Sequence, residues 1–259
     1  MKLMGVVNVT PDSFSDGGLY LDSDAAIAHG EKLVRDGADV LDVGGESTRP
    51  GAAEVDQAEE LRRVQPVVAG LAEAATVSID TSKLAVAEAA IDAGASIVND
   101  VTALRRDPDM AALCAEREVG VVLMHMPGNP RTMQDNPTYD DVVDDVKAFL
   151  AERVEAAVAA GVAEERIWLD PGIGFGKTVE HNLELLRRLA ELRGLGRPLV
   201  IGTSRKSFIG RIDGSGVDER LGGSIATSVL AVAEGADVLR VHDVAETAQA
   251  MRVSEAVLG

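Results

Sequence analysis

Polar side chains of many types directly follow short apolar runs in this sequence. The residues in these positions are Asn8, Asp80, Asn99, Asp100, His125, Asp170, Ser204, Arg205, Lys206, Arg240 and His242. One or two of them would be explained by strands leaving a hydrophobic core, because a chain that exits the core meets water. Carboxylates, amides, imidazoles and cations at so many run ends are better explained by a site that binds a polar ligand and acts on it.

Three segments after such runs are rich in glycine and hydroxyl side chains, at residues 8–18, 44–51 and 202–207. Glycine lets the backbone approach a ligand closely, while hydroxyls and backbone amides donate hydrogen bonds. Arg49, Arg205, Lys206 and Arg240 add positive charge in a chain whose formal net charge is −18. Each segment alone could be a solvated loop, but the three together favour an anion site for a phosphate ester.

The apolar runs themselves have the length of strands and recur along the whole chain. They span residues 3–9, 38–43, 76–79, 95–98, 119–124, 166–169, 198–201 and 236–241. The segments between them carry apolar residues at helical spacing. Repeated strand–helix alternation predicts a parallel sheet with right-handed crossovers. We therefore predict an α/β protein, a single (β/α)8 TIM barrel domain over residues 1–259, with an open doubly wound sheet as the alternative.

A short repeat supports this alternation. The heptapeptide that begins at Gly37 (GADVLDV) reappears at Gly235 (GADVLRV), and a weaker copy (GASIV) begins at Gly94. In each case we expect the glycine to end a helix with a positive φ, and the next strand to start at once. In such a barrel the polar residues lie at the carboxyl ends of the strands, the face where barrel enzymes carry their chemistry.

Composition argues against several classes of protein. The 43 acidic residues outnumber the 25 basic ones, which disfavours nucleic acid or an anionic membrane as a partner. The acidic surface fits either adaptation to high salt or composition bias. No apolar run approaches the roughly 18 residues of a membrane helix, and the first strand follows the N-terminus without a signal peptide, so we expect a cytoplasmic protein. Cys114 lies in a helical pattern and is expected to be a core thiol.

The same segments carry a resemblance to a known enzyme family over essentially the whole chain. The motifs are GVVNVTPDSFSDGG at 5–18, DVGGESTRPG at 42–51, SIDTS at 78–82, VND at 98–100, LMHM at 123–126, LDPGIGFG at 169–176, GTSRKSF at 202–208 and RVHD at 240–243. With them the chain resembles the dihydropteroate synthases. The resemblance implies a TIM-barrel transferase of folate biosynthesis, which joins 6-hydroxymethyl-7,8-dihydropterin pyrophosphate to p-aminobenzoate in an SN1-like reaction that uses Mg2+.

The resemblance also implies roles for individual side chains. Contacts to the pterin are expected from Asp80, Asn99, Met124, Asp170, Gly202 and Lys206. The pyrophosphate is expected to be held by Asn8 (the Mg2+ ligand), Arg49, Arg240 and His242. The p-aminobenzoate site is expected to consist of Phe14, Thr48, Pro50, Phe175 and Ser207. Catalysis is assigned to Arg49, Asp80 and Lys206.

Several of these residues could instead have an ordinary structural role. Asp80 and Asp170 could be helix N-caps, because helical patterns begin shortly after each. His242 could be a strand-end histidine bonded to a neighbour, and His125 is expected to be mainly architectural. We expect loops 10–18 and 45–52 to be disordered without ligand and to close over the pyrophosphate. That closure implies that p-aminobenzoate binds last and that sulfonamides compete with it.

Four other functions stay open at this point. A pterin-binding methyltransferase domain would share the barrel but would not need the anion-binding segments, and a metal-dependent hydrolase would want clustered histidines. A Schiff-base aldolase would use Lys206, although Arg205 beside it suits an anion better. A non-catalytic pterin-binding protein would differ only in turnover. Relatives are commonly dimeric, so the resemblance implies a homodimer, with residues 225–232 and the final helix as its interface.

Overall fold

Eight strands alternate with helices in the computed structural model, which describes residues 1–10, 19–47, 54–129 and 131–258. The strands are β1 (Lys2–Asn8), β2 (Val40–Gly44), β3 (Thr76–Asp80), β4 (Ile97–Asp100), β5 (Gly120–Met124), β6 (Ile167–Asp170), β7 (Val200–Ile201) and β8 (Val238–Val241). The α-helices are α1 (Leu19–Asp36), α2 (Gln57–Leu71), α3 (Leu84–Asp92), α4 (Met110–Glu116), α5 (Val142–Ala159), α6 (Val179–Arg187), α7 (Ser207–Asp213), α8 (Leu221–Ala233) and α9 (Val244–Leu258). Short 3-10 helices are η1 (Glu164–Arg166), η2 (Leu189–Leu195) and η3 (Val217–Glu219).

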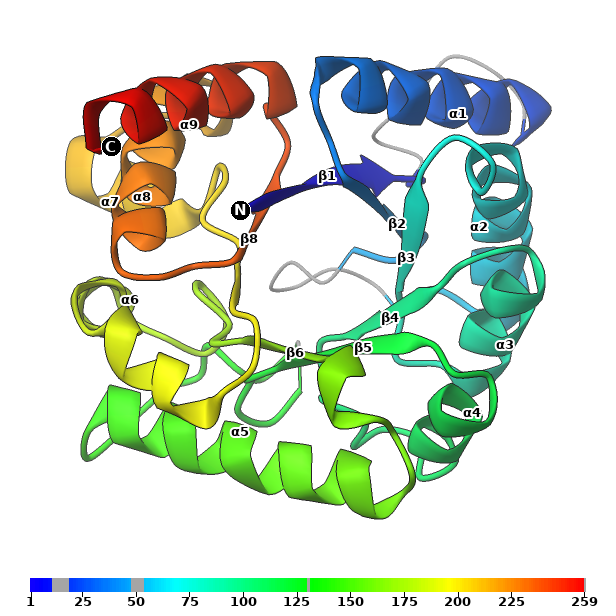
Figure 1. Ribbon diagram of the computed structural model, residues 1–259, viewed down its shortest axis with the longest axis horizontal. Coiled ribbons are helices and arrows are strands. Elements are labelled where there is room, and N and C mark those ends of the chain that lie inside the picture. The colour runs from blue at the N-terminus through cyan, green and yellow to red at the C-terminus, as the bar shows by residue number, and fades with distance from the viewer. Residues whose placement is uncertain (11–18, 48–53, 130, 259) are drawn as a thin grey trace.

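The strands form one parallel sheet that curls into a barrel with the helices outside it (Figure 1). Their order is β6-β5-β4-β3-β2-β1-β8-β7, so each strand lies beside its neighbours in the sequence, and β1 also lies beside β8. A parallel bridge between Leu169 in β6 and Leu199, directly before β7, joins the two remaining edges. This closure confirms the predicted TIM barrel and excludes the open doubly wound sheet.

Two hydrophobic cores explain why these residues form strands. The larger core fills the space between the sheet and the helices, and it consists mainly of branched aliphatic side chains such as Val43, Ile79 and Leu123. A second cluster contains one residue from each of seven strands: Met4, Val40, Ile97, Val122, Trp168, Val200 and Val238. Residues from so many strands meet only inside the barrel, so this second cluster, here called the apolar floor, fills its interior. Strands buried on both faces need apolar residues in succession, which is the pattern that the sequence contains.

The repeated glycines end helices as predicted. Gly37, Gly94 and Gly235 have φ angles of 114°, 112° and 100°, which L side chains rarely adopt. Each follows the end of a helix by one or two residues, and β2, β4 and β8 each begin three residues after their glycine. Glycine is required here because the chain must reverse from helix to strand within a very short connection.

No described helix is both long and apolar enough to cross a membrane. Cys114 is buried in the larger core, between the sheet and the helices, and burial raises the pKa of its thiol to about 12. The expectation of a core thiol is therefore confirmed.

We predict that Gly94→Ala destabilises the fold by about 2–3 kcal/mol, through backbone strain and steric overlap. A Cβ at this position would lie 2.5 Å from the Cβ of Ala72. Urea unfolding followed by circular dichroism measures the change. The matched control is Gly222→Ala in α8, where a Cβ meets nothing within 4 Å; helix propensity predicts that it stabilises the protein by up to about 1 kcal/mol. Equal stability of the two variants would contradict this account of the repeat.

Candidate active site

The interior of the barrel changes from apolar to polar two residues beyond the apolar floor. The positions two residues after its members in β2, β4, β5, β6, β7 and β8 are Asp42, Asn99, Met124, Asp170, Gly202 and Arg240. Because side chains of a strand alternate between its two faces, a spacing of two keeps them on the inner face. These six residues, with Asn8 and Asp80, are called the polar layer. It lies on the carboxyl side of the floor, where chemistry is expected in this fold.

Strand register brings several predicted residues side by side. Asn8 pairs with Gly44, Gly44 with Asp80, and Asp80 with Asn99, so these residues share one rung across four strands. On the other side of β4, Met124 pairs with Asp170. The structure therefore assembles the predicted pterin contacts of four separate motifs around one space.

Arg240 is the cation at the centre of the polar layer. Its Nε donates to Asp42 Oδ2 at 2.6 Å, and its Nη2 donates to Asp80 Oδ2 at 2.8 Å. The Asn99 amide donates to the same Asp42 oxygen at 3.0 Å. Burial disfavours the charge on Arg240, but the attraction of the two carboxylates is stronger than this effect of burial and raises the pKa of Arg240. Arg240 is therefore positively charged in the barrel.

Asp80 is a carboxyl whose pKa is raised above its usual range. Burial is the main cause, and together with the nearby Asp42 it raises the pKa of Asp80 to about 7 in spite of Arg240. Burial also raises the pKa of Asp170, whose Oδ1 accepts a hydrogen bond of 2.7 Å from the amide of Gly172. Two carboxyls with raised pKa values in one layer of a barrel are typical of a functional site.

Neither aspartate caps a helix. The N-cap residue of α3 is Lys83, and that of α6 is Thr178, whose hydroxyl accepts from the amide of His181. The alternative interpretation of Asp80 and Asp170 as N-caps is therefore wrong. Several residues separate each strand end from the helix that follows, and this longer connection leaves the carboxyls inside the barrel.

Lys206, Phe175 and Ser207 lie together at the mouth of the barrel. The Lys206 ammonium is 4.1 Å from the centroid of the Phe175 ring, which is a cation–π distance. Lys206 is the N-cap residue of α7, and the exposed Ser207 is the first residue of that helix. Arg205 instead forms an ion pair of 2.6 Å with Asp243, so the positive charge of Arg205 is compensated by a carboxylate of the protein itself.

The two histidines after strands are both uncharged. The His242 Nδ1 lies 3.0 Å from Ser204 Oγ, and burial lowers the pKa of His242 to about 3. Burial, with the positive charge of Lys177, lowers the pKa of His125 to about 2. His125 packs edge-on against Phe149 with ring centroids 4.9 Å apart, in keeping with the expected architectural role.

Several predicted site residues cannot be placed. Phe14, Thr48, Arg49 and Pro50 lie outside the described residues, as does most of the two loops that were expected to close. Over the part of the chain that the structure describes, no group of three or more His, Cys, Asp or Glu side chains could hold a metal ion. The roles of these residues and of Mg2+ therefore stay predictions.

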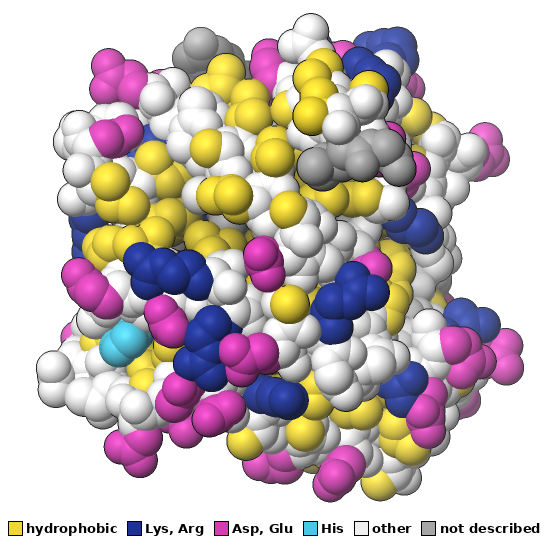
Figure 2. Space-filling model, turned by 60° about the vertical axis from the view of Figure 1, so that its left-hand side comes forward, with side chains coloured by type: hydrophobic (Ala, Val, Ile, Leu, Met, Phe, Trp, Pro, Cys, Tyr) yellow, Lys and Arg dark blue, Asp and Glu magenta, His cyan; other side chains and the backbone are white. Residues whose placement is uncertain are grey.

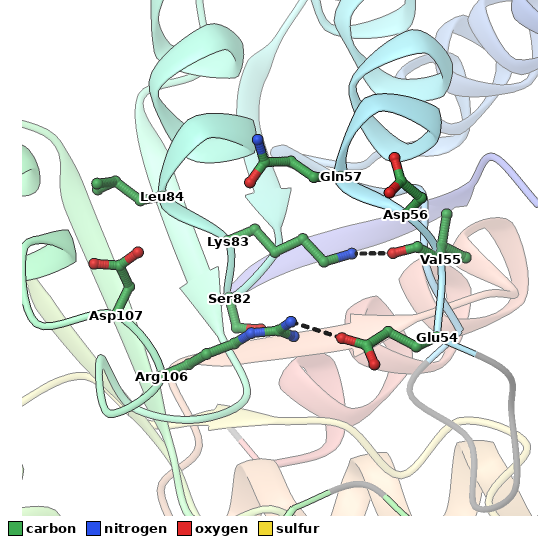
Figure 3. Close-up of a pocket in the computed structure, with 9 residues that line it drawn as sticks. All are labelled: Glu54, Val55, Asp56, Gln57, Ser82, Lys83, Leu84, Arg106 and Asp107. Carbon is green, nitrogen blue, oxygen red and sulfur yellow. Dashed lines mark hydrogen bonds and ion pairs between the residues drawn. The ribbon is translucent and has the colours of Figure 1, made fainter.

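A separate cavity of about 480 Å³ lies where the connection before α2 meets the start of α3 (Figure 3). It is lined by Glu54, Val55, Asp56, Gln57, Ser82, Lys83, Leu84, Arg106 and Asp107. None of the predicted site residues lines it.

Two buried charged residues near the site were not predicted. Asp42 is fully buried and accepts a hydrogen bond from Arg240, but it lies inside an apolar run and not at the end of one. Asp42 lies two residues after Val40, and this spacing places both side chains on the same face of the strand. Lys177 is 2% exposed, and its Nζ lies 2.9 Å from His125 Nδ1, 3.0 Å from Gly172 O and 2.9 Å from Phe175 O. No sequence pattern marks this lysine as buried.

The fold and the polar layer define a barrel enzyme whose site lies at the carboxyl ends of its strands, and comparisons agree. Residues 4–242 match the family described as pterin binding enzyme. The dihydropteroate synthase of Escherichia coli K12 is 50% identical over 99% of this chain and 91% of its own length. That of Clostridium beijerinckii is 44% identical over 99% of this chain and 94% of its own.

Solved structures give the same result. The dihydropteroate synthase of Xanthomonas albilineans with 4-aminobenzoic acid superposes with a TM-score of 0.94 at 50% identity, covering 100% of this chain and 93% of that one. Another structure of the enzyme from the same species, in complex with 7,8-dihydropteroate, has a TM-score of 0.91 at 47% identity. The match covers 100% of this chain and 94% of that one. The chain belongs to the dihydropteroate synthase family of pterin-binding enzymes.

We predict that Lys177 makes stability depend on pH above neutrality. Burial lowers its pKa from 10.5 to about 7, so between these values the unfolded chain binds more protons than the folded one, and stability rises with pH. From pH 7 to 9, wild type should gain about 2 kcal/mol relative to Lys177→Met. Urea unfolding at both pH values measures this, with the exposed Lys32→Met as the control. A difference between wild type and Lys177→Met that does not vary with pH would contradict the buried, weakly basic amine.

Proposed function

We propose that the polar layer of this barrel, with the segments at its mouth, catalyses the condensation of 6-hydroxymethyl-7,8-dihydropterin pyrophosphate with p-aminobenzoate. The observation that carries the proposal is the set of inward donors and acceptors directly above an apolar floor: Asp42, Asp80, Asn99, Asp170 and Arg240. A flat heterocycle with a polar edge fits such a layer. Relatives whose structures are described as complexes with 4-aminobenzoic acid and with 7,8-dihydropteroate support it.

The pterin ring is recognised through its pyrimidine edge. Asp170 accepts hydrogen bonds from the 2-amino group and the ring N3–H, Asn99 pairs with the same edge, and Lys206 donates to a ring oxygen or nitrogen. Met124 lies in a small cluster with Val101, Met126, Met133 and the half-buried Phe175, and this cluster gives the ring an apolar contact. At Gly202, next to Arg240, the missing side chain leaves space for the ligand.

Bond cleavage leaves positive charge on the pterin methylene and negative charge on pyrophosphate. Asp80 faces the same space as Asp170, and a cation that forms there favours the ionised form of Asp80, so the carboxylate stabilises the transition state more than the ground state. The pterin ring delocalises the charge, and no covalent nucleophile is needed. Arg240 and Arg49 hold the leaving group, and the neutral His242 can donate a hydrogen bond to it.

Asn8 suits the Mg2+ that the family resemblance implies. It ends β1 with its side chain half-buried, on the same rung as Asp80. An amide oxygen together with phosphate oxygens and waters is a donor set that Mg2+ prefers. When bound, Mg2+ would neutralise charge on the pyrophosphate.

The p-aminobenzoate site lies at the mouth of the barrel. Ser207 and the first amides of α7 donate to its carboxylate, while Phe175 forms one wall of the ring site, together with Phe14, Thr48 and Pro50 from the two loops. The cation–π contact holds Lys206 against Phe175, so the pterin contact and the aminobenzoate wall are placed together.

Helices α8 and α9 expose hydrophobic side chains that a second copy of the chain could cover. Leu230 in α8 and Val253 and Val257 in α9 are 61%, 59% and 77% exposed. Figure 2 brings the side of α7, α8 and α9 forward, and hydrophobic side chains gather on it. We propose that a second copy covers this face in a cytoplasmic homodimer. The net charge of −18 does not suit a nucleic-acid partner.

We predict that Lys206→Ala lowers kcat/KM by about 100-fold or more, because a preorganised donor to the reacting ring is lost. The assay contains the dihydropterin pyrophosphate, p-aminobenzoate and Mg2+, and it follows dihydropteroate and pyrophosphate release. The kcat/KM of Arg49→Ala should be lowered by a similar factor. Lys32→Ala, which changes an exposed lysine on α1, should keep kcat/KM within about twofold of the wild-type value. No product from well-folded wild type would overturn the proposal and favour a pterin-binding methyltransferase domain, tested next with methyltetrahydrofolate.

We predict ordered binding, with p-aminobenzoate last. Calorimetry should detect p-aminobenzoate binding to the protein only when pyrophosphate and Mg2+ are also present, and a sulfonamide should compete with it under the same conditions. Equal affinity with and without pyrophosphate would show that the aminobenzoate site forms independently of the loops.

A further inference from the structure

Lys83 is a buried cation that the proposed chemistry does not use. Its side chain is 7% exposed. Its Nζ donates to Glu46 Oε2 at 2.8 Å and to Glu60 Oε2 at 2.5 Å. It also donates to the carbonyl of Val55 at 2.6 Å, the contact that Figure 3 shows. All three ammonium hydrogens are therefore used. Burial opposes the charge of Lys83, but the hydrogen bonds to Glu46 and Glu60 outweigh this and raise its pKa.

The partners of Lys83 come from three separate parts of the chain. Glu60 lies in α2 and is 1% exposed. Its other oxygen accepts from the Thr81 hydroxyl at 2.8 Å, and Thr81 accepts in turn from the amide of Lys83 at 3.2 Å. A fully buried carboxylate is stable only with such partners. This network, here called the Lys83 clamp, consists of Glu46, Val55, Glu60, Thr81 and Lys83.

The clamp holds both ends of one connection. Glu46 follows β2 and Val55 precedes α2, and the Val55 amide donates to Glu46 Oε1 at 3.0 Å. Just before Glu46, the carbonyl of Gly45 accepts from Arg63 Nη1 at 2.9 Å. A Cβ on Gly45 would lie 2.8 Å from Val64 Cγ1, so this end also packs tightly against α2.

We propose that Lys83 is a positioning residue for the β2–α2 connection, whose Arg49 and Thr48 serve the pyrophosphate and p-aminobenzoate sites. The inference rests on the proposed function of those residues. Glu46 and Val55 are the clamp residues on either side of the segment that carries Thr48 and Arg49. A connection that is joined at both of its ends has less conformational entropy to lose when a ligand binds than one that is joined at a single end.

A purely structural role for the clamp predicts a different result. Loss of a buried ion pair would then lower the stability of the barrel and leave the properties of the folded fraction unchanged. A positioning role changes the steps that use Arg49 and Thr48 and spares the pterin contacts in β4, β5 and β6. These outcomes separate in the ligand affinities and in the KM values for the two substrates.

The test uses the full chain with Lys83→Met/Glu60→Gln, which removes both charges and avoids an unpaired buried carboxylate. A milder variant, Glu46→Gln, keeps an oxygen for the Val55 amide and loses only the charge that faces Lys83. The control is Arg197→Met, which breaks the ion pair between the partly buried Arg197 and the exposed Glu164 at the amino-terminal end of β7. It reports general destabilisation remote from the site.

In folded protein, checked by circular dichroism, the double variant should raise KM for p-aminobenzoate about tenfold and weaken pyrophosphate binding with Mg2+ by a similar factor. Its affinity for a pterin should stay within about twofold, and Arg197→Met should change none of these values. Unchanged KM and pyrophosphate affinity in folded variants would overturn the positioning role, and so would equal loss of pterin binding. If wild type forms no product, the proposed function fails, but the pyrophosphate titration still decides whether the clamp acts.

Discussion

The pairing of Arg240 with Asp42 and Asp80 is the interaction on which the site depends. Three carboxylates, those of Asp42, Asp80 and Asp170, lie in one layer, and burial penalises each charge. A buried guanidinium between two of them compensates that charge, while loss of either partner leaves an unpaired ion inside the barrel. The same Asp42 oxygen also accepts from Asn99. One cluster of charged and polar side chains therefore joins β8, β2, β3 and β4 and sets the electrostatics of the polar layer.

The barrel separates the residues that hold the fold from those that face the ligand. The outer core between sheet and helices and the apolar floor inside the barrel supply the burial that stabilises it. The polar layer begins two residues later on the inner face. Two buried lysines then fix the connections above it: Lys177 bonds to the β6–α6 connection, and Lys83 bonds to both ends of the β2–α2 connection. Each of these lysines joins its connection to a neighbouring part of the barrel through a buried ammonium.

Much of the fold could be read from local patterns. Each predicted apolar run overlaps an observed strand, with differences of one to two residues at the ends, because apolar character does not mark where ladder hydrogen bonds begin. Gly37, Gly94 and Gly235 were identified because a positive φ requires a particular residue type. The N-cap interpretation of Asp80 and Asp170 failed because spacing alone does not show where a helix starts. Asp42 was missed because its neighbours are apolar, and only the inner face of a closed barrel gives it polar partners.

The sequence by itself determined the strand–helix alternation, the turn glycines and the motifs that carry the family resemblance, since these depend on residue type and short-range spacing. Only the tertiary structure decided which charges meet. Arg240 pairs with Asp42 and Asp80, from strands at the other end of the chain, and Lys83 reaches Glu46 and Val55 across a connection. Such contacts depend on barrel closure and register, which bring distant residues within hydrogen-bonding distance, and no local pattern encodes that distance.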